Sequence, residues 1–205
     1  MIRLYIDITA TIDDEAANLC RYVPSPRSHL PLVLHLIQAI SVLKVEYLFG
    51  DDPWAHSGPL VFTATSWTES EMSEKSMLEH CREECQLADE IVTLAGERFE
   101  LPILFGRSLV HAVPAAFMNR HRRHGVWRFH DGPVEATTPR LTGLPSLAEL
   151  CAPMQIDFQP PGDGDTFAQM GEARAKAVWL LDEYWTSGGD PEMVRERREM
   201  LVDLS

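Results

Sequence analysis

Apolar and polar residues alternate at the beginning of the chain. Residues 2–11 (IRLYIDITAT) follow this pattern and are rich in β-branched side chains, which predicts a β-strand. Apolar runs at 32–49 and 59–66 predict two further strands, and three strands joined by turns indicate an antiparallel meander. Asp7 stands in the middle of the first strand, where burying an unpaired acid is costly, so we expect it to face a functional site.

Farther along the chain, apolar residues recur at spacings of three and four. This spacing predicts a helix over residues 68–88, with Thr68 or Ser70 as its N-cap. Loops rich in Gly and Pro separate the helices that follow. The other predicted helices cover residues 102–116, 115–124, 146–151, 166–185 and a charged C-terminal stretch, 190–205.

The middle of the chain has the pattern of a strand, a sharp turn and a helix. An apolar run at 90–94 predicts a buried strand, Gly96 ends it, and Pro102 suits the first turn of a helix. Glu100 lies at the crossing between the two elements. Such a turn presents a polar side chain at a cleft, although a carboxylate in a surface loop explains the pattern as well.

The residues around this turn, AGERFELPIL, carry a resemblance to a known family. They resemble the second active-site motif of the DnaQ-like 3'-5' exonuclease superfamily, in the branch similar to the proofreading domain of family B polymerases, which reads Asn-Gly-x-x-Phe-Asp-x-Pro-x-Leu. Ala95 replaces the Asn of that motif, and Glu100 replaces its metal-binding Asp. Four positions match: Gly96, Phe99, Pro102 and Leu104.

The resemblance implies a fold and a domain plan. It implies an α/β, ribonuclease H-like fold, with a mixed sheet made of an antiparallel three-strand meander plus parallel strands and flanked by helices. We expect this exonuclease-like domain to span residues 1–189, and residues 190–205 to form a C-terminal helix packed on it.

The first and third motifs of the superfamily are degraded in this chain. Asp7 occupies the position of the first-motif Asp, but Thr9 stands where the family has Glu. The third motif has two possible registers, one placing Glu172 and the other Asp182 at the position of its Asp. Neither register recovers the Tyr or His that acts as general base.

The resemblance also implies a chemistry, phosphodiester hydrolysis with two Mg²⁺ or Mn²⁺ ions. The residues left for it are Asp7, Glu100 and Glu172 as catalytic and metal-binding groups, with Asp182 as a further metal ligand. A Glu in place of an Asp moves the carboxylate by about 1 Å, and such a displacement costs about a hundredfold in rate. Loss of the general base removes a further factor of roughly 10² to 10⁴.

Two functional hypotheses follow. The first is a degenerate, inactive 3'-5' exonuclease-like domain, or pseudoenzyme, that acts as a nucleic-acid-binding or protein-interaction module. The alternative is an active metal-dependent 3'-5' exonuclease with an unusual Asp/Glu metal site. The degraded motifs favour the first hypothesis, and the acids that persist at three of the four positions favour the second.

The charge distribution bears on the partner. A net charge of -13 argues against general affinity for phosphate backbones. However, residues 101–130 contain no acid, and the basic residues there form a candidate face for binding single-stranded nucleic acid. A solvated helix end explains this cluster of basic residues equally well. In that case the partner is a protein. The candidate nucleic-acid-binding residues are Arg98, Arg107, Arg120, Arg122 and Arg123.

The remaining composition indicates a cytoplasmic protein without membrane association. No signal peptide or membrane-spanning run is recognisable, and four irregularly placed cysteines favour reduced thiols over a disulfide framework. His80, Cys81 and Cys85 fall close together on the predicted helix, but no second ligand pair completes a zinc site. We therefore expect the two cysteines to pack in the core.

Overall fold

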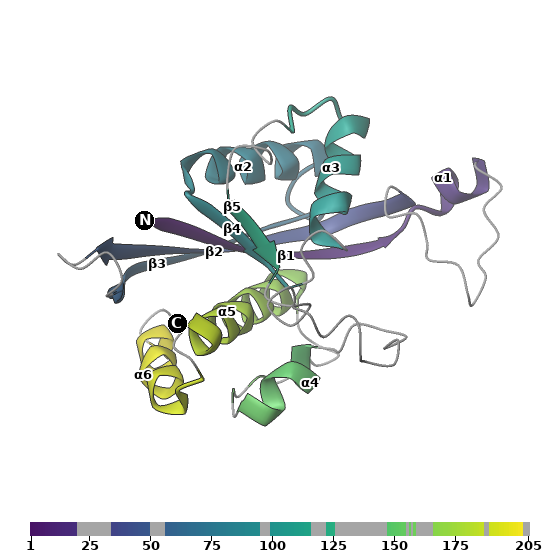
Figure 1. Cartoon of the computed structure of the whole chain (residues 1–205). Helices are drawn as coiled ribbons and strands as arrows, with labels where there is room; N and C mark the ends of the chain where they lie inside the picture. The colour runs from purple at the N-terminus through teal and green to yellow at the C-terminus, as the bar shows by residue number, and fades with distance from the viewer. Residues whose placement is uncertain are drawn as a thin grey trace, which may run out of the picture.

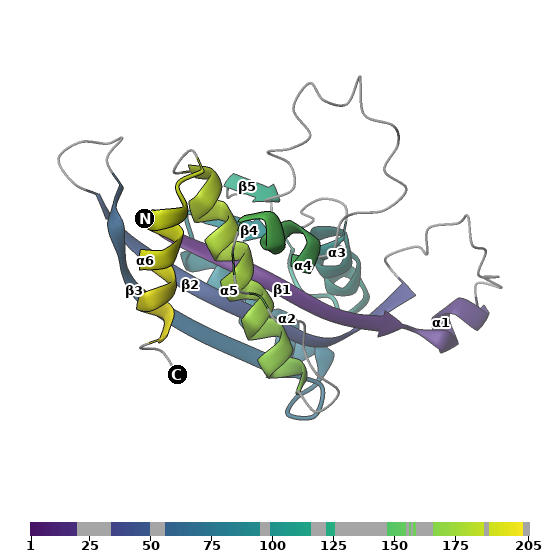
Figure 2. The ribbon, with the colours of Figure 1, turned by 90° about the horizontal axis from the view of Figure 1, so that it is seen from below.

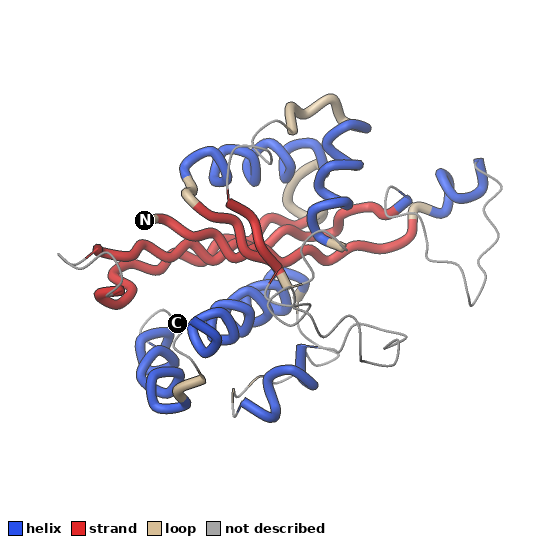
Figure 3. The backbone as a smooth tube through the Cα atoms, viewed as in Figure 1, coloured by secondary structure: helices blue, strands red, loops and turns tan. Residues whose placement is uncertain are grey.

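Helices cover both faces of one mixed β-sheet (Figure 1). Figure 3 shows the strands as one layer between the helices. This arrangement is a computed structural model. It describes residues 1–19, 34–49, 56–94, 99–115, 122–125, 147–154, 156, 158, 166–186 and 189–202.

The sheet has five strands in the order β3-β2-β1-β4-β5. They are β1 (Ile2–Ile12), β2 (His35–Phe49), β3 (His56–Thr68), β4 (Glu90–Thr93) and β5 (Arg122–Gly125). β1, β2 and β3 pair antiparallel, whereas β4 pairs parallel with β1 and β5 pairs parallel with β4. The predicted α/β class, with an antiparallel three-strand meander and parallel strands in one mixed sheet, is confirmed.

The helices divide between the two faces of the sheet. α2 and α3 cover one face, while α5 crosses the other face with α6 packed beside it and α4 on the same side (Figures 1 and 2). α1 extends from the end of β1. Their bounds are α1 (Asp14–Leu19), α2 (Glu74–Leu87), α3 (Glu100–Val110), α4 (Leu147–Cys151), α5 (Phe167–Thr186) and α6 (Pro191–Val202).

The alternation in β1 directs two kinds of side chain to the two helical layers. Leu4, Ile6 and Ile8 pack in the apolar core under α2 and α3, which also contains Cys81 and Cys85 as the sequence predicts. The intervening residues face α5 because successive side chains of a strand point to opposite faces. They are Arg3, Tyr5, Asp7 and Thr9, and all four carry a charge or a hydroxyl.

The structure corrects two predicted helix boundaries near α2 and α3. α2 begins only at Glu74, and its N-cap is Ser73, whose Oγ accepts a hydrogen bond from the Ser76 amide at 3.2 Å. Thr68 instead ends β3. α3 ends at Val110 and not near residue 116, because Ala112 has a φ of 53°, outside the helical region.

The helix predicted over residues 115–124 is wrong at its C-terminal end. Residues 122–125 form β5, whose Arg122 lies beside Glu90 of β4 in a parallel register. Pairing with β4 overrides the helical preference of this short segment. Residues 116–121 of the prediction lie outside the described residues.

α6 lies in the C-terminal stretch for which the sequence predicts a helix. Val194 and Leu201 of α6 are buried in the apolar core that α5 forms with the sheet. Among the described helices, none combines the length and the apolar character that crossing a lipid bilayer requires.

Candidate functional site

Asp7 lies in the middle of the sheet, beneath the first half of α5. It is 6% exposed, and across the strands it aligns with Ser41 of β2, which in turn aligns with Ser66 of β3. The two serine hydroxyls are 2.7 Å apart. Gly171 of α5 rests on this polar row: a Cβ there would lie 2.0 Å from Ser41 Oγ and 3.6 Å from Asp7 Oδ2. The helix therefore approaches Asp7 closely because position 171 has no side chain.

Arg174 is the cation that accompanies Asp7. Its Nε lies 3.6 Å from Asp7 Oδ2, and its Nη2 donates a hydrogen bond to Thr9 Oγ1 at 3.3 Å. The Asp7 Oδ2 and Arg174 Nε atoms are both buried without a hydrogen-bond partner, so their pairing is electrostatic and loosely fitted. Burial raises the pKa of Asp7 to about 6, although Arg174 pulls it down.

Glu100 begins α3 on the opposite helical layer, as the strand-turn-helix pattern predicts. It is 4% exposed, and its neighbour Phe99 lies edge-on to His35 at the start of β2, with 6.3 Å between ring centroids. Burial and Arg174 are the causes that shift the pKa of Asp7. The structure thus brings Arg174 to Asp7, and it places Glu100 at the start of α3.

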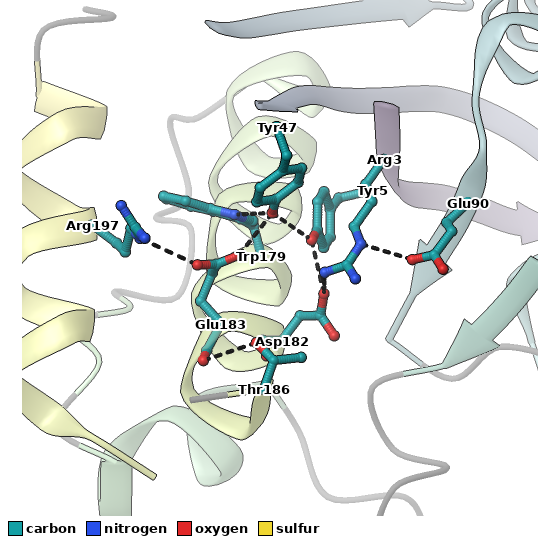
Figure 4. Close-up of polar contacts among 9 residues, drawn as sticks. All are labelled: Arg3, Tyr5, Tyr47, Glu90, Trp179, Asp182, Glu183, Thr186 and Arg197. Carbon is teal, nitrogen blue, oxygen red and sulfur yellow. Dashed lines mark hydrogen bonds and ion pairs between the residues drawn. The ribbon is translucent and has the colours of Figure 1, made fainter. Parts of the chain in front are cut away.

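The two registers of the third motif occupy different parts of α5. Glu172 follows Gly171 and is partly exposed, next to the turn that approaches Asp7. Asp182 is fully buried about 15 Å farther along the helix than Glu172, given the rise per residue. There it accepts hydrogen bonds from Tyr5 Oη at 2.8 Å and Arg3 Nη1 at 3.2 Å (Figure 4). Asp182 therefore belongs to a separate cluster.

This second cluster continues from β1 through β2 to α6. Arg3 Nε donates to Glu90 at 2.7 Å, and the hydroxyls of Tyr5 and Tyr47 lie 3.1 Å apart. We call these residues the tyrosine cluster; Figure 4 shows them converging between the sheet and α5. Its members are Arg3, Tyr5, Tyr47, Glu90, Trp179, Asp182, Glu183 and Arg197.

Proton counting explains how the tyrosine cluster is held. Each phenol has one proton to donate. Tyr5 donates its proton to Asp182 at 2.8 Å, and Tyr47 donates its proton to Glu183 at 2.7 Å. Trp179 Nε1 then donates to Tyr47 Oη at 3.0 Å. Burial raises the pKa of both tyrosines, and the adjacent carboxylates raise it further, so both remain donors at neutral pH.

The positive member of this cluster stays charged in its buried position. Burial alone would lower the pKa of the Arg3 guanidinium, but Tyr5, Asp182 and Glu90 together hold it above its ordinary value. Because Glu90 of β4 and Asp182 of α5 share the guanidinium of Arg3 in β1, the cluster fixes α5 against β1 and β4. The tyrosine cluster therefore has a structural role.

A third polar cluster ties α2, α3 and the sheet together. Glu74 Oε1 accepts hydrogen bonds from Arg107 Nε and the Ile37 amide, both at 2.8 Å, and Glu74 Oε2 lies 2.6 Å from His111 Nε2. Arg107 Nη1 also lies 3.5 Å from Asp13 Oδ2. Burial would raise the pKa of Glu74, but the donors from Arg107, Ile37 and His111 lower it below its usual range.

The arginines that the sequence predicts to bind nucleic acid differ in their surroundings. Arg107 is 5% exposed and is engaged by Glu74 and Asp13, so it is not part of a free basic face. Arg122 and Arg123 lie in β5, at the end of the sheet opposite β3. Arg98 and Arg120 lie outside the described residues.

The acids on the α5 face do not fit a centre for two divalent cations. The guanidinium of Arg174 lies against Asp7 and Thr9, the two positions that the resemblance assigns to the first motif, and would repel a divalent ion there. Asp182 already accepts hydrogen bonds from Arg3 and Tyr5. Among the described residues, no group of three or more His, Cys, Asp or Glu is arranged to hold a metal ion.

Sequence reasoning missed Arg174, Gly171 and the tyrosine cluster. Arg174 follows two positions after Glu172, and a basic residue beside a degraded acidic motif is the signal that marks it. Tyr5 lies two positions before Asp7, on the same face of the strand, which places both side chains under one helix. The partner residues in β2 and α5 become visible only in the folded register.

No family model matches the chain, and no curated protein matches it.

Proposed function

We propose that this chain is a catalytically silent domain with a ribonuclease H-like sheet, descended from a 3'-5' exonuclease and acting through a macromolecular partner. The observation that supports this most is Arg174, whose guanidinium lies against Asp7 and Thr9. In the family that the sequence resembles, these two positions serve divalent cations. An arginine there neutralises the acid that a metal would need.

The strand order supports the same ancestry. A central first strand, flanked by an antiparallel meander on one side and by parallel strands on the other, is the arrangement that the resemblance implies. Glu100 begins α3, which agrees with the position that the resemblance gives to the second-motif acid. A fold does not fix an activity, so the residues of the site carry the functional proposal.

A protein is a better partner for this domain than a nucleic acid. The net charge is -13, and Arg107, one of the five arginines of the candidate basic face, is buried in ion pairs with Glu74 and Asp13. Nucleic-acid affinity depends on exposed Lys and Arg that release counterions from phosphates. Arg122 and Arg123 of β5 remain as the candidates for a nucleic-acid contact.

A nuclease assay tests the silent-domain proposal. Labelled single-stranded DNA and RNA are incubated with the protein in Mg²⁺ and in Mn²⁺, and we expect no shortening from the 3' end. Trimming by the unmodified protein that Asp7→Ala abolishes would establish the alternative, an active exonuclease with an Asp/Glu metal site.

A metal titration separates the role of Arg174 from that of the other residues. We expect no Mn²⁺ binding to the unmodified protein, and weak binding once Arg174→Ala leaves Asp7 without its cation. Arg195→Ala is the matched control, because Arg195 is a largely exposed arginine on α6, distant in sequence from the Asp7 site. Tight Mn²⁺ binding by the unmodified protein, lost in Asp7→Ala, would contradict the proposal.

A further inference from the structure

Residues 61–68 of β3, the outer strand of the meander, lack the usual protection of a sheet edge, whereas the proline and the register shifts of this strand lie before residue 61. β3 pairs with β2 on one side and lies at the rim of the sheet (Figure 2). Edge strands normally carry charges, prolines or bulges that prevent pairing with another chain. Residues 61–68, VFTATSWT, contain no charged residue and no proline, in a chain of net charge -13. They also pair with β2 without a register shift.

The hydrogen-bonding direction of this edge follows from the end of the strand. The Glu69 amide donates to the Gln38 carbonyl at 2.8 Å, so odd-numbered residues of this stretch direct their backbone groups to β2. Phe62, Ala64 and Ser66 therefore direct their amides and carbonyls outward. In the described part of the chain, these outward groups have no backbone partner.

We propose that the outer edge of β3 pairs antiparallel with the same edge of a second copy of this chain, about a two-fold axis at Ala64. In this register Ala64 faces Ala64 of the second copy, and Phe62 faces Ser66. Each of these pairs exchanges two backbone hydrogen bonds. The two sheets become one continuous sheet across the dimer.

The side chains in this register are self-complementary. Val61, which is 48% exposed before pairing, faces Trp67 of the second copy, a β-branched and aromatic pair of the kind that stabilises antiparallel strands. Thr63 faces Thr65, a second favourable pair. No like charges oppose each other, because residues 61–68 are uncharged. A peptide of another protein gains no such symmetry, so a second copy is the occupant.

The net charge predicts the salt dependence of this dimer. Two chains of charge -13 repel each other at long range, and salt screens this repulsion. The dissociation constant of the dimer is therefore expected to fall as salt is added. Binding to a phosphate backbone has the opposite dependence, because added salt weakens it.

Sedimentation velocity over a range of concentrations tests the proposal with two charge variants. Thr63→Glu with Thr65→Glu places like charges opposite each other, and it should weaken the dimer by about tenfold or more. Thr63→Glu with Thr65→Lys places opposite charges there, and the dimer should persist. In both variants the carboxylate introduced by Thr63→Glu lies across from Lys44 of its own chain, so the monomer tolerates both.

Hydrogen exchange places the interface independently of these variants. In the dimer, the amides of Phe62, Ala64 and Ser66 should exchange more slowly as the protein concentration rises. A monomer at every concentration, equal dimer affinity of the two charge variants, or concentration-dependent protection away from β3 would each overturn the proposal. Circular dichroism of each variant confirms that it is folded.

Discussion

Two aspartates lie between β1 and α5, Asp7 on the strand and Asp182 on the helix, yet their surroundings differ. Asp182 is fully buried, and one of its oxygens, Oδ2, accepts hydrogen bonds from both Tyr5 and Arg3. Asp7 is buried as well, but its Oδ2 has no hydrogen-bond partner, and Arg174 stands 3.6 Å away. The carboxylate of Asp182 is compensated by directed donors, whereas that of Asp7 is accompanied by a cation that makes no hydrogen bond to its Oδ2.

This difference carries an energetic consequence. Burial of a charge is costly unless directed donors compensate it. The tyrosine cluster supplies such donors to Asp182, so this carboxylate stabilises the junction of α5 with β1. The Asp7 carboxylate has one loosely fitted cation beside it. Part of the free-energy cost of burying its charge therefore remains uncompensated. Substitutions at the two positions should therefore act in opposite directions.

The largest expected effect is at Asp182. Asp182→Ala removes the acceptor of Tyr5 and one carboxylate partner of buried Arg3, and breaking a buried pair in this way costs about 3 to 5 kcal/mol. Urea unfolding followed by circular dichroism measures the change. A loss below about 1 kcal/mol would show that the tyrosine cluster does not lock α5 to the sheet.

The pH dependence of stability should show the cost at Asp7. Its pKa is raised from 3.8 to about 6 in the folded chain, so the stability contribution of the protonated acid is complete below about pH 4 and is lost as the pH rises through 6. A shift of this size corresponds to roughly 3 kcal/mol. Asp7→Asn keeps the shape without the charge, and should be at least as stable as the unmodified protein at pH 7.

Urea unfolding of both proteins between pH 4 and pH 7 measures this contribution as a difference. Other acids also titrate in this range; Glu74 has a lowered pKa and loses its stabilising contacts as the pH falls. The difference between Asp7→Asn and the unmodified protein cancels those common terms. A difference that stays constant with pH would contradict the raised pKa of Asp7.

The sequence predicted the sheet well because its signals are local. Alternation in β1 and the apolar run of β4 need no distant partner to be recognised, and Pro102 marks the first turn of α3. β5 was missed because residues 122–125 carry no strand pattern, and pairing with β4 decides their conformation. The pairing register with β4, rather than the amino-acid composition of residues 122–125, determines that this segment forms a strand.

The candidate site was less predictable than the fold. Asp7 could be identified as site-facing, since an acid among apolar residues in a strand requires a partner. Its actual partner, Arg174, comes from α5, and only the packing of Gly171 on Ser41 brings the two together. A resemblance to a metal-binding family suggests acids, and it gives no reason to search for a cation in their place.

A smaller effect is expected at the contact that brings α5 to Asp7. Gly171→Ala adds a methyl group 2.0 Å from Ser41 Oγ and 2.7 Å from Ser41 Cβ, so the helix or the strand must shift. Overpacking of this kind costs about 1 to 3 kcal/mol, less the roughly 0.8 to 1.0 kcal/mol that Ala gains over Gly in a helix. Ser41→Gly in the same chain removes the colliding atoms and should recover most of the loss in urea unfolding. Failure of that second substitution to recover stability would mean that α5 does not rest on Ser41, and the close approach of the helix to Asp7 would lose its explanation.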